Sequence, residues 1–130
     1  MKVCCSLFLS LIIISCSSND ILSYGNYKLK NNRCYKLIDS NYELCVDSIS
    51  DSRCPEDVVC IWEGNASVYF SLKSPNENTS FTLNTFRGFQ TDSILKGFKF
   101  TLLDVLPYPV NTTSSEQNNY NVEINIVDSI

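Results

Sequence analysis

The chain contains no histidine among its 130 residues. Histidine is a common general base and metal ligand, so its absence excludes Ser–His and Cys–His catalytic pairs. Basic residues are also few, because ten Lys and Arg stand against fourteen Asp and Glu, a net charge of −4. A surface of this sign repels the phosphates of nucleic acids. We therefore expect a protein that is not an enzyme, binds no nucleic acid and uses no cofactor or metal.

The longest apolar run lies at the N-terminus, where Lys2 precedes an apolar stretch over residues 3–14. This run is shorter than the ~20 residues that a membrane-spanning helix needs, and it is typical of a secretory signal peptide. Its ending, Ile-Ile-Ser-Cys at positions 13–16, resembles the lipobox of bacterial lipoproteins. In that family the cysteine thiol is acylated and becomes the new N-terminus. The resemblance implies a signal peptide over residues 1–15 and a lipid on Cys16.

The residues after Cys16 are small and polar, Ser-Ser-Asn-Asp at positions 17–20, as expected for a flexible tether. They weakly resemble the export signals of Bacteroidetes lipoproteins. We predict a lipidated N-terminus and tether over residues 16–23 and a single domain over residues 24–130. Multiple acyl chains hold a protein firmly on a membrane, which implies a cell-envelope protein at the outer membrane, facing the periplasm or the surface. The alternatives are an ordinary signal peptide with an unmodified Cys16, or an uncleaved anchor.

Four cysteines remain in the domain when Cys4, Cys5 and Cys16 are set aside: Cys34, Cys45, Cys54 and Cys60. An even number in a small exported domain favours two disulfides. The competing interpretation is a zinc site. The four positions lack the close Cys-x-x-Cys pairs that are typical of structural zinc, so we predict disulfides and no metal.

Strand-like alternation dominates the rest of the chain. Apolar and polar residues alternate over residues 68–73, 81–84, 98–103 and 121–126, which is the pattern of half-buried strands. Turn-rich segments at residues 74–78, 87–88 and 107–119 separate these runs. We predict an all-β domain, a single antiparallel β-sandwich or small barrel stapled by disulfides.

One predicted hairpin has a defined register. If the loop is Asp39-Ser40, or is wider by one residue on each side, Lys36 stands opposite Glu43 and Cys34 opposite Cys45. One face then gathers the apolar side chains of Tyr35, Leu37, Tyr42 and Leu44. A shift by one residue would mix the two faces. We therefore predict a Cys34–Cys45 disulfide, and by elimination a Cys54–Cys60 disulfide.

The segment around the second disulfide resembles a group of small exported bacterial lipoproteins. It contains Asp-Ser-Arg-Cys-Pro at positions 51–55 and Cys-x-Trp-x-Gly-x-Ala at positions 60–66. The group also tends to carry Leu-x-Pro-Tyr-Pro before a closing strand, and residues 106–109 and 120–127 are similar, although Val-Leu-Pro at positions 105–107 departs from the common Leu-Thr-Pro. The resemblance implies a cell-envelope location and the all-β fold, and it implies no activity.

The residues of this segment have plausible structural roles. Asp51 can cap a turn, and Arg53 can pair with Asp51, Asp57 or Glu63. We expect Trp62, the only tryptophan, to cover the Cys54–Cys60 ring or the sandwich edge as part of the core. Gly64 lets the chain bend into the next strand.

The same segment is also the candidate binding loop. The residues assigned to it are Arg53, Pro55, Glu56, Asp57 and Trp62. Its carboxylates suggest a calcium site or a glycosidase pair as alternatives, but a solvated acidic loop is the simpler interpretation. We therefore predict a non-catalytic envelope lipoprotein, anchored to the membrane by its lipid, that binds a protein or glycan through its loops. The alternative is an inhibitor or immunity-type protein that blocks a secreted enzyme with this rigid loop.

Overall fold

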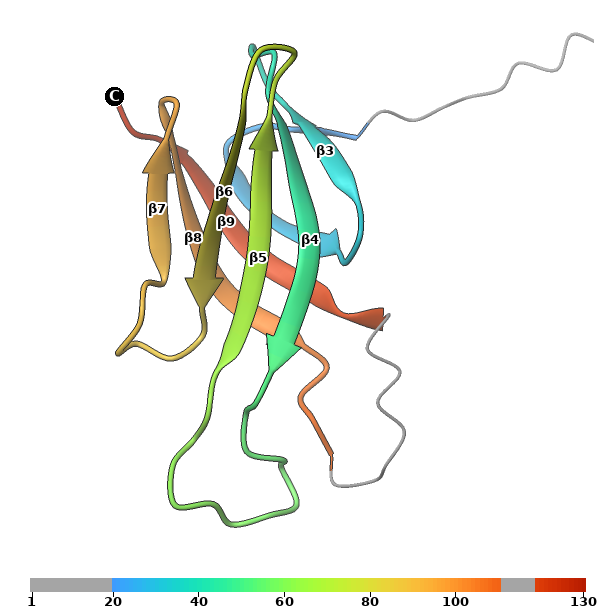
Figure 1. Ribbon diagram of the computed structural model, residues 1–130, viewed down its shortest axis with the longest axis vertical. Coiled ribbons are helices and arrows are strands. Elements are labelled where there is room, and N and C mark those ends of the chain that lie inside the picture. Colours follow the sequence, from blue (N-terminus) through green and yellow to red (C-terminus); the bar gives the residue numbers. More distant parts are fainter. Residues whose placement is uncertain (1–19, 111–118) are drawn as a thin grey trace, which may run out of the picture.

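The computed structural model describes residues 20–110 and 119–130, and these form nine β-strands (Figure 1). None of the described residues belongs to a helix long and apolar enough to cross a membrane. The predicted signal peptide and Cys16 lie outside the described residues. The strands are β1 (Ile21–Leu22), β2 (Gly25–Lys30), β3 (Cys34–Leu37), β4 (Glu43–Asp51), β5 (Ala66–Lys73), β6 (Asn78–Asn84), β7 (Asp92–Leu95), β8 (Phe98–Leu106) and β9 (Asn121–Asp128).

Two sheets face each other across one core. The first has the order β1-β3-β4-β5-β6 and the second the order β2-β9-β8-β7. All pairs are antiparallel except β1 with β3, which is parallel. At one side the chain passes directly from β6 to β7, and Asn84 N donates to Gln90 O at 2.9 Å, so the sandwich curls into a half-barrel (Figure 1). The predicted all-β, disulfide-stapled sandwich is confirmed.

The alternating residues form the core, as their periodicity predicts. The inward side chains of β5, β8 and β9 are buried: Val68, Phe70, Leu72, Phe98, Phe100, Leu102, Val122, Ile124 and Ile126. Phe81 of β6 stacks between Phe70 and Phe100, with ring centroids 5.1 and 5.5 Å away. Burying each such side chain contributes about 1.5–3 kcal/mol.

A β-bulge adjusts the end of β8. The register with β9 shifts between Leu102 and Asp104, so the extra residue lets both Leu102 and Val105 face the core. Leu103 consequently points outward and is 49% exposed. A bulge of this kind re-aims the residues that follow it, and here it places the carbonyl of Val105 toward the candidate site.

The predicted hairpin between β3 and β4 is confirmed in its register. Cys34 stands opposite Cys45 and Lys36 opposite Glu43, and the first disulfide joins the two cysteines with a Cα–Cα distance of 4.0 Å. The loop is the wider of the two predicted forms, because Leu37 N donates to Tyr42 O at 3.0 Å across residues 38–41. The apolar face packs into the core as predicted.

The folded part of the chain begins earlier than the sequence suggests. Residues 20–23 belong to the predicted tether, yet Ile21 and Leu22 pair with β3. Leu22 is 4% exposed, and its carbonyl accepts a hydrogen bond from Ile38 N at 2.9 Å. This short strand covers part of the outer edge of β3. Its signal in the sequence is the apolar pair Ile21-Leu22, which directly follows the polar residues 17–20.

Candidate functional site

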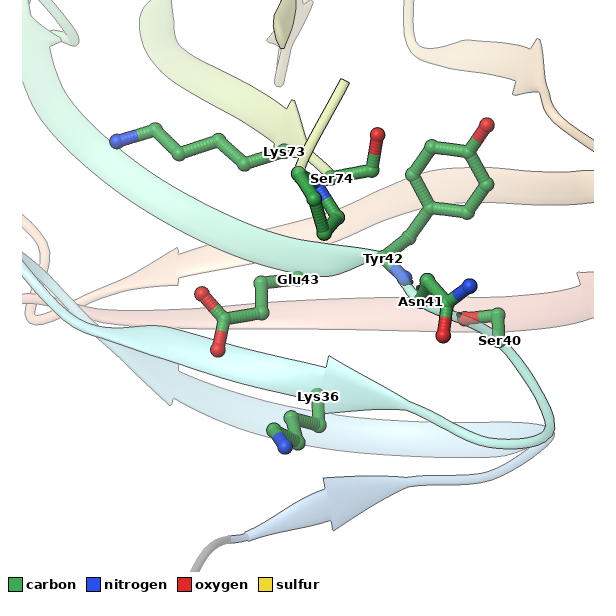
Figure 2. A pocket seen from close by; sticks show the side chains of 8 residues that line it. Lys36, Ser40, Asn41, Tyr42, Glu43, Lys73 and Ser74 are labelled. Carbon is green, nitrogen blue, oxygen red and sulfur yellow. Dashed lines mark hydrogen bonds between the residues drawn. The ribbon is translucent and has the colours of Figure 1, made fainter. Parts of the chain in front are cut away.

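One pocket lies beside the β3–β4 hairpin and has a volume of about 450 Å³ (Figure 2). Its lining residues are Lys36, Ser40, Asn41, Tyr42, Glu43, Lys73, Ser74 and Pro75. Glu43 lies between Lys36 and Lys73 because β4 pairs with β3 on one side and β5 on the other. The Ser40 hydroxyl donates to Leu37 O at 3.1 Å and accepts from Tyr42 N at 3.2 Å, so it stabilises the hairpin turn.

The predicted binding loop lies at the other end of the sandwich. Residues 52–65 join β4 to β5 and extend below the sheets in Figure 1, away from the blue residues where the described chain begins. The β6–β7 loop and residues 107–110 after β8 lie at the same end (Figure 1). The predicted Cys54–Cys60 disulfide closes this loop, with a Cα–Cα distance of 6.0 Å.

The neck of this loop continues the pairing of β4 with β5. Ser52 N and the Ser52 hydroxyl both donate to Asn65 O at 2.8 Å, and Cys54 N donates to Glu63 O at 2.9 Å. Gly64 has a φ of 75°, and a Cβ at this position would overlap Ser52 O and stand 2.7 Å from Arg53 Cα. The predicted bend at Gly64 is confirmed, and its cause is the close approach of two main chains.

Arg53 joins the loop to the opposite sheet. Its guanidinium donates to both Asp51 carboxylate oxygens at 2.9 and 2.8 Å, to Val105 O at 2.6 Å and to Pro107 O at 3.1 Å. The Arg53 side chain is buried, and its Cζ lies 4.1 Å from the centroid of the Tyr108 ring. Of the three predicted acidic partners, Asp51 is the one that it contacts. Arg53 therefore acts inside the domain and does not lie on the outer surface of the loop.

Asp51 is the acidic centre of this network. Its carboxylate accepts hydrogen bonds from Arg53 N at 3.1 Å, as the predicted cap, and from the Tyr120 hydroxyl at 3.0 Å. Burial alone raises the pKa of Asp51, but the hydrogen bonds and charge of Arg53 outweigh burial and hold this pKa below its ordinary value. Burial and the bond to Asp51 together raise the pKa of Tyr120.

The remaining acidic residues do not gather into a site. Asp51 points inward to Arg53, whereas Glu56, Asp57 and Glu63 are exposed. Over residues 20–110 and 119–130, no three His, Cys, Asp or Glu side chains come close enough together to hold a metal ion.

Pro55, another residue of the predicted binding loop, is half-buried, and its carbonyl accepts a hydrogen bond from Val58 N at 3.1 Å.

Trp62 does not lie in the core, and the prediction that it does is wrong. Its side chain is 53% exposed and meets Phe86 edge to face, with ring centroids 5.6 Å apart. Phe86 contacts Phe89 in the same manner at 5.3 Å. The reason is the shape of the loop: it extends past the last paired residues, and Phe86 of the β6–β7 loop packs against one edge of Trp62 while half of the side chain stays exposed.

Further apolar side chains of the same two loops are exposed. Val59 and Ile61 are fully exposed, and Phe89 is 52% exposed. We call Val59, Ile61, Trp62 and Phe89 the tip. Sequence reasoning missed the other three members, although Val-Val-Cys-Ile-Trp at positions 58–62 is an apolar run inside a loop, and Phe89 follows a turn. Soluble monomers rarely expose contiguous apolar groups of this kind without a partner.

A second pocket of about 230 Å³ lies at the base of the tip. Its lining residues are Arg53, Cys54, Glu63, Gly64, Thr85, Phe86 and Tyr108. The fold and this region define a disulfide-stapled all-β domain with one apolar end. No protein-family model, no curated protein and no solved structure matches the chain. The functional argument therefore rests on the geometry of this end.

Proposed function

We propose that the protein is a lipid-anchored, non-catalytic module of the cell envelope that binds its partner through the tip. The observation that carries this proposal is the exposure of Val59, Ile61 and Trp62 on a loop closed by a disulfide. Interface centres are enriched in exposed aromatic and apolar anchors held on rigid supports. The two disulfides also favour an oxidising compartment outside the cytoplasm.

A binding role agrees better with the polar groups of this end than a catalytic role does. Asp51 and Arg53 neutralise each other, and the remaining Arg53 donors bind the carbonyls of Val105 and Pro107. These groups position the loop. The chain has no histidine to act as a general base beside them.

The position of Cys16 supports the same function. Three residues separate it from Asp20, so four Cα–Cα steps of an acylated chain would hold Asp20 within about 14 Å of the membrane surface. The described chain begins at the end opposite the loop of residues 52–65 (Figure 1). Under this proposal the tip therefore faces away from the membrane, where a partner can reach it.

Lipidation can be tested by replacing Cys16 with alanine. We expect the wild-type protein to fractionate with membranes and to carry the added mass of acyl chains, and the Cys16→Ala variant to lose both properties. Membrane fractionation and intact mass spectrometry measure the outcome. Wild-type protein without added mass would contradict the lipid anchor.

Binding by the tip can be tested by photo-crosslinking in intact cells. A benzoylphenylalanine at position 61 of the full chain should give one discrete adduct of higher mass after irradiation. The matched control carries the same group at position 94, because Ile94 on β7 is also exposed, at 62%, and lies outside the tip. No adduct from position 61, or the same adduct from both positions, would contradict the proposal.

The stapled neck favours one second candidate, an inhibitor or immunity-type protein. A loop that is already ordered loses little conformational entropy when it enters an enzyme's cleft. In that case the adduct from position 61 would contain a secreted hydrolase, and the purified full chain would abolish its activity at a 1:1 ratio. If the partner is not an enzyme, or is an enzyme that stays active in the complex, the inhibitor hypothesis is wrong and the binding-module function stands.

A further inference from the structure

The shape of the tip restricts the form of its partner. Val59 and Ile61 are fully exposed, and they belong to the loop of residues 52–65, which projects beyond both sheets (Figure 1). A projecting group can bury its side chains on all sides only in a concave surface. Val59 and Ile61 form no hydrogen bonds through their side chains, so the walls of that surface must be apolar for burial to be favourable.

The charge of the loop restricts the partner further. Glu56, Asp57 and Glu63 are exposed on the loop of residues 52–65, where Arg53 is the only basic residue, and the β6–β7 loop adds one exposed basic residue, Arg87, two positions before Phe89. Arg53 is buried and paired with Asp51 at 2.8 Å, so the outer surface of the loop is acidic. An acidic rim repels anionic lipid headgroups and acidic glycans, and it attracts lysine and arginine side chains.

The loop is also ordered before any partner arrives. The Cys54–Cys60 disulfide closes its end, Ser52 and Cys54 pair with Asn65 and Glu63 in the neck, and Glu56 N donates to Pro109 O at 3.2 Å. A surface that is already rigid fits a partner with its own fixed shape, because neither side has to pay ordering entropy on association. A folded protein with a cleft has such a shape, whereas a fluid bilayer does not.

We propose that the tip inserts into a concave apolar cleft of a folded protein whose rim carries lysine or arginine residues opposite Glu56 and Glu63. This inference rests on the proposed binding function and adds the chemistry of the partner. The apolar side chains of the tip supply most of the affinity, and the acidic rim speeds and orients association.

The adduct formed from position 61 in intact cells is the first test. We expect a second polypeptide, identified by the peptide that is crosslinked to position 61. An adduct whose added mass is a lipid or a glycan would overturn this inference while leaving a binding function for the tip in place. No adduct at all would instead remove the proposed function itself.

The second test uses the crosslinked protein, purified separately, as the probe. Replacing both rim acids, Glu56→Gln with Glu63→Gln, should slow association with the full chain about tenfold at low salt and flatten its salt dependence. The matched control removes two charges at the other end, Asp39→Asn with Glu77→Gln, and should leave the association rate unchanged. Equal effects of the two pairs, or none from the rim pair, would overturn the basic rim.

The tip requires a separate variant with a different kinetic signature. Ile61→Ser with Trp62→Ser should raise the dissociation rate at least about thirtyfold and keep the salt dependence of association. Both side chains are exposed, so the midpoint of thermal unfolding should stay within a few degrees of the wild type. A dissociation rate unchanged in this folded variant would contradict insertion of the tip into an apolar cleft.

Discussion

Replacing Arg53 with methionine should lower the free energy of unfolding by about 3–5 kcal/mol, because it leaves the buried Asp51 carboxylate without its partner. The substitution also removes the hydrogen bonds to Val105 O and Pro107 O, which join the two sheets. Methionine keeps much of the volume of the side chain, so the loss is mainly electrostatic. Urea unfolding monitored by circular dichroism measures the effect.

The matched control for Arg53→Met is Lys99→Met. Lys99 forms an ion pair with Asp92 at 3.3 Å, but both side chains are more than two-fifths exposed. An exposed pair contributes about 0–1 kcal/mol, so this variant should unfold close to the wild type. Similar losses in the free energy of unfolding from both substitutions would show that the buried Arg53–Asp51 pair contributes no more stability than an exposed ion pair.

The pH dependence of the free energy of unfolding provides a second test of Arg53→Met. The lowered pKa of Asp51 stabilises the wild type above the ordinary pKa of aspartate, and this stability is lost as the pH falls through the lowered value. In Arg53→Met the buried Asp51 lacks a cationic partner and keeps only the hydrogen bonds from the main-chain N of residue 53 and the Tyr120 hydroxyl, so its charged form is least favourable at neutral pH and protonation relieves the cost. The difference between the two proteins should therefore be greatest at pH 7 and shrink below about pH 4.

The core strands could be predicted from the sequence because their signals were local. The Lys36–Glu43 pair, the facing cysteines and the apolar face of the β3–β4 hairpin all required one register, and no other satisfied the three together. Strands β2 and β7 were not predicted. Both lie at the edge of a sheet. β7 has four residues and no fully buried side chain, so its alternation is weak, whereas in β2 the alternation of Tyr27 and Leu29 with lysines was present and was missed.

The candidate site was only partly predictable. The bond between Arg53 and Asp51 spans two positions and was among the predicted pairs, whereas its bonds to Val105 O and Pro107 O span 52 and 54 positions. Contacts of that range depend on how two sheets pack and on a bulge in β8. Trp62 was misassigned for a similar reason: a tryptophan beside a disulfide packs inward only if its loop folds back, and sequence patterns do not report the direction of a loop.

Replacing Gly64 with alanine should lower the free energy of unfolding by about 3 kcal/mol, which combines a left-handed backbone cost of ~1–2 kcal/mol with overpacking of a similar size. The added Cβ would meet main-chain atoms of Ser52 and Arg53, and neither can move without breaking the neck pairing of Ser52 with Asn65. Thermal and urea unfolding of the purified full chain measure the loss.

Gly97→Ala separates the two parts of the Gly64 effect. Gly97 has a similar φ of 84°, but a Cβ there would meet only the Ile130 side chain at 3.6 Å, an ordinary contact. This variant should therefore show the backbone cost alone, about 1–2 kcal/mol. Because Gly64 sits in the neck, its substitution should also weaken partner binding in conditions where the domain remains folded, and Gly97→Ala should not. Equal losses of stability from the two alanines would mean that the neck yields to the extra methyl group, and the loop would then lack the rigidity on which insertion of the tip depends.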